Sequence, residues 1–311
     1  MVSLAKTPFG FFAISMQDQI VDVEKLSNDP KKVAETLDGD AFKKWKQELK
    51  KKGMDIKDTV FDPMKAAALI GVSRKDFLDF SRLVEIELSK IQIKKFIGKD
   101  YLILQSVGGL DDLNKSINIV VNRIREWFGM HFPELRIEDH EKFLKKIISG
   151  VDRVESMGID LSKDDLRAIL KLAEMILEMY KTKTGIEAYI DKLMGEVSPN
   201  VKNLAGANLG ARLIEKAGSL RSLAILPAST IQVLGAEKAL FKHLQKGTPS
   251  PKHGVIFQHP VVNRAPSTKR GKLARTLATK IALGAKADFF SGELRPKLME
   301  SWEKRVKEVL K

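Results

Sequence analysis

The chain has 311 residues, of which 43% are apolar, and its 54 Lys and Arg against 40 Asp and Glu give a formal net charge of +14. This length predicts about two or three domains with real hydrophobic cores. The absence of cysteine excludes disulfides, cysteine–zinc sites and thiol nucleophiles, and it favours a cytosolic protein. No apolar run reaches the roughly 18 residues of a membrane-spanning helix, and the N-terminus reads as a strand and not as a signal peptide.

The positive charge is concentrated at the C-terminal end of the chain. Residues 235–311 carry 17 Lys and Arg against 6 Asp and Glu, whereas the first 234 residues carry 37 against 34. A local excess of this kind indicates a surface that binds a polyanion, with nucleic acid as the leading candidate. The alternative is a solvated, lysine-rich surface without a partner.

Residues 1–110 are predicted to form a small α/β domain. The segments FGFFAI and YLILQSV combine aromatic and β-branched residues, which predicts strands at 9–14 and 101–107. Short helices are predicted after Asp29, Asp40 and Asp62, because Asp is typical of helix starts. The domain contains no glycine-rich phosphate loop and no GK[ST] motif.

Residues 111–196 are predicted to form an antiparallel coiled-coil helical hairpin. In the first half, apolar residues recur every three or four positions, with an interruption at Gly129 and Pro133. These residues are Leu113, Ile117, Val120, Ile124 and Trp127, then Phe143, Ile147, Val151 and Val154. A second helix is predicted to start at the N-cap Ser162, with Asp165 three residues on. Its near-heptad seam consists of Leu166, Ile169, Ala173, Ile176 and Tyr180, followed by Ile186, Ile190 and Leu193.

More apolar residues lie beside this seam than one hairpin needs. They are Leu170, Leu172, Leu177, Met179 and Tyr189. A second copy of the hairpin is one way to cover them, so we predict a homodimer. Packing against the chain's own domains is an equally weighted alternative.

Residues 197–311 are predicted to be all-α, with one wide loop. Gly206 and Gly210, among alanines, predict a helix that packs closely on its neighbours, because the spacing does not match a nucleotide-binding glycine loop. A helix is predicted between Gly235 and Gly247, then a proline-punctuated loop over 248–268. In the helix after it, Leu273, Leu277 and Ile281 share the inner face. The outer face carries Lys272, Arg275, Thr279 and Lys286.

The histidines near the C-terminal loop do not predict a metal or catalytic site. His253 and His259 have no cysteine to accompany them, and no carboxylate lies between Lys238 and Asp288. A histidine base also needs a nucleophile and an orienting acid, and Glu237 is the only acid of the 235–260 stretch. We therefore predict no catalytic residue and no metal ligand.

An anion-binding surface accounts for more of the residues in this region than a metal or catalytic site does. Gly235 lets a backbone approach the free N–H groups of a helix start, and Lys and Arg position phosphates. Phe257 is expected to pack inward and not to stack on a base. The predicted RNA-facing residues are Gly235, Ala236, Glu237, Lys238, Lys242, Lys252, His253, Gln258, His259, Arg264, Lys269, Arg270, Lys272, Arg275 and Lys286. His243 is expected to be an ordinary packing residue.

Three stretches, GAEKALFKHL, PKHGVIFQHP and KRGKLARTLATKIALGAKADFFSGE, resemble the signature of the Nop domain. NLGARLIEKAGSLRSLAILPASTIQVLGAEKALF extends this resemblance upstream, and VNRIREWFGMHFPEL resembles the family's N-terminal segment. The match is in the right order over most of the chain. The residues after Pro260 (VVNRAPST) depart from the family's aromatic-rich versions, and the family often carries a lysine-rich tail beyond the position of Lys311.

The resemblance implies a scaffold of box C/D small ribonucleoproteins, which guide 2′-O-methylation of ribosomal and transfer RNA. It implies that the N-terminal domain holds the methyltransferase fibrillarin, that the hairpin makes a homodimer, and that the C-terminal Nop domain grips kink-turn RNA. A small kink-turn-binding ribosomal-type protein and the guide–target duplex complete the expected partners. No cofactor is expected in this chain, because S-adenosylmethionine would bind fibrillarin, and the expected location is the cytoplasm of a prokaryotic, archaeal-like cell.

Two alternatives remain open from the sequence. One is a spliceosomal-type Nop-domain assembly factor, which the strand-like N-terminus and IREWFGMHFPEL disfavour. The other is an RNA-modifying enzyme in its own right, which the missing catalytic set disfavours.

Overall fold

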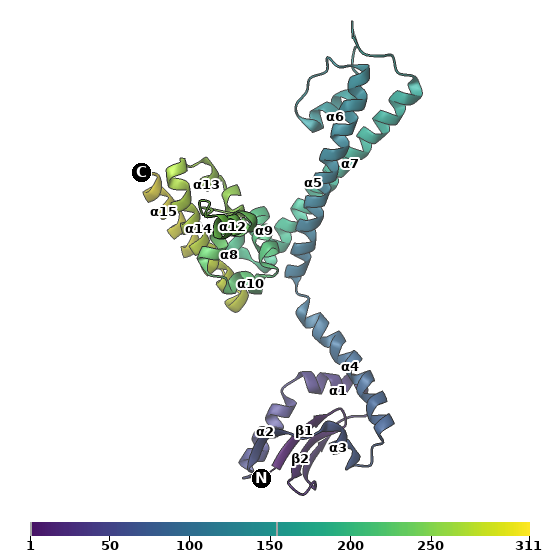
Figure 1. Cartoon of the computed structure of the whole chain (residues 1–311), viewed down its shortest axis with the longest axis vertical. Helices are drawn as coiled ribbons and strands as arrows, with labels where there is room; N and C mark the ends of the chain where they lie inside the picture. Colours follow the sequence, from purple (N-terminus) through teal and green to yellow (C-terminus); the bar gives the residue numbers. More distant parts are fainter. Residues whose placement is uncertain (1, 154) are drawn as a thin grey trace. The chain divides into compact units, whose positions relative to one another are not determined.

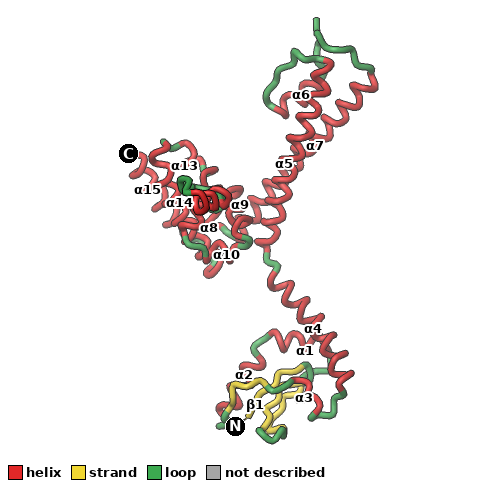
Figure 2. The backbone as a smooth tube through the Cα atoms, viewed as in Figure 1, coloured by secondary structure: helices red, strands yellow, loops and turns green. Residues whose placement is uncertain are grey.

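The structure is a computed structural model that describes residues 2–153 and 155–311, so the predicted seam position Val154 lies outside the described residues. The chain divides into two compact units, Met1–Gly98 and Lys99–Lys311. Strands occur only in the first unit, within the described part of the chain (Figure 2). None of the helices described is both long enough and apolar enough to cross a membrane.

The first unit is built on a four-stranded sheet of order β3-β2-β1-β4 (Figure 1). Its strands are β1 (Val2–Thr7), β2 (Gly10–Ser15), β3 (Ile20–Lys25) and β4 (Ile56–Val60). β1 and β3 pair antiparallel with β2, and β4 pairs parallel with β1. The predicted strand at 9–14 is confirmed by β2, and the N-terminal strand by β1.

Helices cover both faces of this sheet. Neighbouring residues of a strand point to opposite faces and therefore contact different helices. Phe11 packs with Trp45 of α2 (Ala41–Lys51), whereas Phe12 packs with Ala66 of α3 (Pro63–Ala68). The helices predicted after Asp29, Asp40 and Asp62 are confirmed as α1 (Pro30–Asp38), α2 and α3. Asp29 and Asp62 accept backbone N–H bonds at these starts, whereas the Asp40 side chain makes no such bond. β3, β4 and α4 (Arg74–Phe96) were not predicted from the sequence.

The predicted strand at 101–107 is wrong, because these residues belong to α5 (Lys99–His131). Ile103, Val107 and Leu110 recur at helical spacing and are buried in one cluster with residues of α7 (Lys163–Val197). β-branched and aromatic residues favour strands only where a sheet can bury them. Here α7 buries these residues, so the segment is helical.

The antiparallel hairpin is confirmed. The start of α5 packs on the end of α7, where Ile103 and Ile190 share a cluster, and Ile124 meets Ile169 further along (Figure 1). α6 (His140–Ser149) packs beside α7. Ser162 and Asp165 form the predicted capping box at the start of α7, with the Ser162 hydroxyl accepting from the Asp165 N–H at 3.2 Å.

The rest of the second unit is helical around α14. It consists of α8 (Pro199–Ala205), α9 (Ala207–Ala217), α10 (Leu220–Ile225), α11 (Ala228–Val233), α12 (Glu237–Lys246), α13 (Pro260–Arg264), α14 (Ser267–Lys286) and α15 (Pro296–Leu310), with a 3₁₀ turn η1 (Val255–Gln258) and a π-helical turn η2 (Ala287–Ser291). Leu273, Leu277 and Ile281 of α14 are fully buried, as predicted. Gly210 packs closely as expected, since a Cβ there would lie 2.7 Å from Met194, but Gly206 adopts a positive φ and separates α8 from α9.

The predicted fold class is therefore confirmed: mostly α, with a small α/β N-terminal domain, a coiled-coil hairpin and an all-α C-terminal region. The expected loop at 248–268 holds η1 and α13 and is more ordered than predicted. The predicted boundary near residue 110 falls inside α5, and the hairpin shares one compact unit with the C-terminal helices.

Candidate nucleic-acid interface

A basic pocket opens at the start of α14. Its volume is about 450 Å³, and Lys252, Lys272 and Arg275 contribute three cations to its wall. The other lining residues are Gln232, Ser250, Pro251, Ser267, Thr268 and Gly271. Among these described lining residues none is acidic, so every charged side chain of the wall is positive and favours an anion.

The loop that carries Lys252 is fixed to the end of α11. The Gln232 amide donates to the Lys252 carbonyl at 2.6 Å, and the Gly254 N–H donates back to the Gln232 carbonyl at 2.9 Å. Glycine is needed at 254, because a Cβ there would lie 2.0 Å from the Leu234 carbonyl oxygen. These contacts hold Lys252 opposite α14.

The start of α14 adds its own positive end to the pocket. This helix has 20 residues, and its first turn, with Ser267 and Thr268, faces the cavity. Unpaired N–H groups and the helix dipole favour an anion at such a position. Lys272 and Arg275 project from the exposed side of the same helix. Together, the cations and the helix start form a site suited to phosphate.

The start of α12 is less open than the sequence suggests. Gly235 adopts φ +85°, and a Cβ there would lie 2.5 Å from the Val255 side chain. Its N–H donates to the Glu237 carboxylate at 2.6 Å, so a side chain of the protein already occupies this amide. Ala236 is half-buried, whereas Lys238 and Lys242 are exposed, one helical turn apart.

Two predicted RNA-facing side chains stack on Phe257 instead of standing free. The His253 ring lies parallel to the Phe257 ring, with centroids 4.5 Å apart, and the Arg270 guanidinium lies 5.4 Å from the same ring. Phe257 packs against the core, as expected. Lys269 donates to the Leu310 carbonyl at 2.8 Å. The side chains of His253, Arg270 and Lys269 are thus held by contacts within the protein.

Gln258 and His259 face cavities other than the basic pocket. Gln258 lines one together with Glu187 and Asp191, two acids that repel a polyanion. His259 caps α13 through its Nδ1, which accepts from the Val261 N–H at 3.3 Å, and its ring meets Trp302 edge-on at 5.8 Å. Burial lowers the pKa of His259, and a hydrogen bond with the Leu204 backbone only partly opposes this. His259 is therefore placed to act as a neutral structural residue.

The remaining predicted cations are exposed on helices. Arg264 ends α13, and Lys286 ends α14. His243 is bound to the Thr248 carbonyl and closes the turn after α12, in agreement with a packing role.

Sequence reasoning missed several residues of the basic surface. Gln232, Ser267 and Thr268 line the pocket. Of these, only Ser267 and Thr268 were recognisable from the local sequence, because Ser and Thr are typical of helix starts. A second groove of about 560 Å³ runs between α14 and α15. Its cations are Arg275, Lys280, Lys304 and Arg305, and Glu308, which pairs with Arg305 at 2.7 Å, also lines it. The pairing of two helices creates this groove, so no local pattern reveals it.

The predicted hairpin seam is buried inside the chain's own hairpin. Ile169, Ala173 and Ile176 are fully buried in a cluster with α5 and α6, and Leu166 and Tyr180 pack at its edge. Burial raises the pKa of Tyr180.

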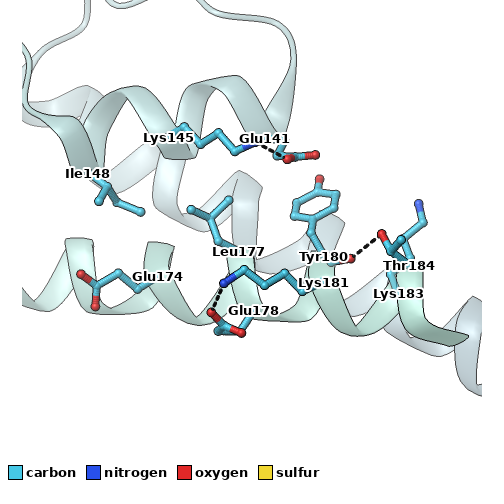
Figure 3. Close-up of a pocket in the computed structure, with 10 residues that line it drawn as sticks. All are labelled: Glu141, Lys145, Ile148, Glu174, Leu177, Glu178, Tyr180, Lys181, Lys183 and Thr184. Atoms are coloured by element: carbon cyan, nitrogen blue, oxygen red, sulfur yellow. Dashed lines mark hydrogen bonds and ion pairs between the residues drawn. The ribbon is translucent and has the colours of Figure 1, made fainter.

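A pocket of about 560 Å³ lies between α6 and α7 (Figure 3). Its wall holds Glu141, Glu174 and Glu178 against Lys145, Lys181 and Lys183. The three glutamates balance the three lysines, and Figure 3 shows Lys145 paired with Glu141 and Lys181 paired with Glu178. The wall of this pocket therefore has no net positive charge that would attract a polyanion. Within the described residues, no group of three or more His, Cys, Asp or Glu could hold a metal ion.

The sequence matches a family model described as "Nop: snoRNA binding domain, fibrillarin" over residues 109–149 and 136–311. A NOP5 family protein of Methanocaldococcus jannaschii is 34% identical over 99% of this chain and 86% of its own length. Nucleolar protein 58 of Schizosaccharomyces pombe is 36% identical over 73% of this chain, which spans 50% of that protein. A chain of the crystal structure of a fibrillarin/Nop5p complex is 26% identical over 98% of this chain and 99% of its own length, with a TM-score of 0.49. The resemblance of the C-terminal stretches to the Nop signature is thus confirmed, and the chain belongs to the Nop family.

Proposed function

We propose that this protein is a non-catalytic scaffold of a box C/D small ribonucleoprotein that guides 2′-O-methylation of RNA. One observation carries the proposal: a pocket at the start of α14, whose charged lining residues are the cations Lys252, Lys272 and Arg275, lies within the segment that matches a snoRNA-binding family. The concentration of positive charge after residue 234 supports it. The cellular setting we propose is the cytoplasm of an archaeal-like cell.

The RNA face of this scaffold centres on Lys252, Lys272 and Arg275. Lys238, Lys242 and Lys286 extend it along α12 and α14. The groove beside α15 adds Lys304. In this proposal Glu237, His253, Arg270 and His259 hold the surface in shape, while the exposed cations contact phosphates.

The three regions take three roles in the proposal. Residues 1–110 bind fibrillarin, residues 111–196 dimerise, and residues 197–311 bind kink-turn RNA together with a small kink-turn-binding protein. For the dimer, the apolar residues that remain exposed on α5 and α7 are the candidates, since the seam itself is buried. They are Leu102, Ile119, Met130, Met175 and Tyr189.

Reconstitution tests this function directly. The full chain is combined with fibrillarin, the kink-turn-binding protein, a box C/D RNA, a target RNA and a methyl donor. We expect methylation only when the chain and fibrillarin are both present. Methyl transfer by the chain with RNA and methyl donor alone would instead show that the chain is an enzyme. Full assembly and methylation in the absence of this chain would reject the scaffold role.

A further inference from the structure

The exposed row of α14 does not end with the helix. Exposed positions recur every three or four residues along α14 and continue into the π-helical turn η2. They are Lys272, Arg275, Thr279, Leu283, Lys286 and Phe290. Because Phe290 comes four residues after Lys286, it lies about one turn further along the same side. The row therefore passes from cations to an aromatic ring.

The two phenylalanines of this turn are left in water. Phe289 is 40% exposed and Phe290 is 69% exposed. Their rings meet edge-to-face with centroids 4.9 Å apart, so Phe289 supports Phe290 from the side. Leu283, 44% exposed, adds apolar surface to the same row. Adjacent exposed apolar residues are typical of a binding surface.

A buried carboxylate holds this turn in place. Asp288, directly before Phe289, accepts from the Ser198 hydroxyl at 2.7 Å, the Asn200 side-chain amide at 2.6 Å and the Val201 N–H at 3.0 Å. The carboxylate thereby caps the start of α8 and ties η2 to it. Because the backbone under Phe289 and Phe290 is fixed, a ligand can bind the rings at a small entropic cost.

We propose that Phe290, supported by Phe289, is a stacking platform for an unpaired RNA base, and that the strand's phosphates follow Lys272, Arg275 and Lys286. The proposal rests on the RNA-binding function proposed above. Rings that continue a row of cations suit single-stranded RNA, which needs both stacking surfaces and positive charge. Lys272 and Phe290 are 18 positions apart, which corresponds to about 27 Å along the helix and is long enough for several nucleotides.

Fluorescence anisotropy with the full chain tests the platform. The probe is a labelled single-stranded RNA of about 10 nucleotides that contains 2-aminopurine, whose fluorescence falls on stacking. Phe290→Ala and Phe290→Leu are each expected to weaken binding about tenfold and to abolish the quenching, whereas Phe290→Tyr retains both. The salt dependence of binding should not change, because no phosphate contact is lost. Ile159→Ala, which removes a 57% exposed side chain of the hairpin loop, is the matched control.

The outcomes separate this inference from the function on which it rests. Wild-type affinity and quenching in Phe290→Leu, with Arg275→Ala still impaired, overturn the platform alone. Failure of the wild-type chain to bind the probe overturns both the platform and the RNA face. RNA binding that survives Phe290→Ala, together with loss of a protein partner, would reassign the rings to a protein contact.

Discussion

The Arg212 guanidinium on α9 forms a two-point ion pair with the Asp111 carboxylate on α5. About three helical turns earlier on α5, the Asp100 carboxylate accepts from the Leu220 N–H at 3.0 Å, at the start of α10. Two acids of the hairpin thus hold two helices of the C-terminal region. These contacts fix the RNA face relative to the hairpin within the second unit.

We expect Arg212→Ala to loosen this junction. It leaves Asp111 half-buried without its charged partner, which should lower the free energy of unfolding by about 1–3 kcal/mol. Urea denaturation measures the loss, and hydrogen exchange should rise in α9 and α10. Arg167→Ala is the control, because its 3.5 Å pair with Asp164 is exposed on both sides and contributes less than about 0.5 kcal/mol. Equal effects of the two substitutions would show that the junction is not stabilised by this pair.

The basic pocket predicts how RNA affinity depends on salt. Lys272→Ala and Arg275→Ala should each weaken binding and reduce the slope of log affinity against log salt by about 0.7–0.9, the value for one phosphate contact. Titrations with box C/D RNA and the kink-turn-binding protein at several salt concentrations measure this slope. Lys171→Ala removes an exposed lysine of α7 and should change neither quantity. Unchanged slopes in both pocket variants would place the RNA face elsewhere.

The pKa of His259 predicts a loss of stability in mild acid. Because the folded pKa lies below the usual value of 6.5, the unfolded chain takes up a proton first as the pH falls. The contribution of neutral His259 is fully present above about pH 6.5 and decreases from there down to the folded pKa. Urea denaturation between pH 8 and pH 5 should show this decrease.

His259→Asn separates this effect from other titrating groups. Asn can still cap α13 but does not titrate in this range, so its stability should depend less on pH than that of the wild type. An identical pH dependence in the two proteins would exclude His259 as the cause.

Substitutions in the hairpin should disrupt folding and dimerisation separately. Ile176 is fully buried, so Ile176→Glu places a charge in the core of the hairpin and should unfold α6 and α7 or lower stability by about 3 kcal/mol or more. Ile119 is 69% exposed, so Ile119→Glu should leave the melting temperature nearly unchanged and yield monomers. Sedimentation and circular dichroism measure the two properties. A dimer that persists in Ile119→Glu would remove this residue from the proposed dimer surface.

The sequence predicted the helices well where the signals were local. Asp29, Asp62 and the pair Ser162 and Asp165 cap helices in the structure as expected, because a cap depends only on residues within one turn. The segment at 101–107 was misassigned, because its apolar residues suit both a strand and a buried helix. Only contact with α7 distinguishes the two.

The candidate site was predicted in composition but not in arrangement. Lys252, Lys272 and Arg275 were named from charge alone, and the structure brings them into one pocket. Arg270 was named for its charge and His253 for its place in the loop after α12, yet both stack on Phe257. Charge is visible in the sequence, whereas the direction of a side chain depends on what packs beneath it.

By itself, the sequence determined the helical character of most of the chain, the hairpin, the concentration of cations after residue 234 and the membership of the Nop family, since each follows from residue type, spacing or motif. Only the tertiary structure decided which cations share a pocket and that Asp288 holds Phe289 and Phe290 at the surface. These relationships join residues from different elements, and long-range packing sets them.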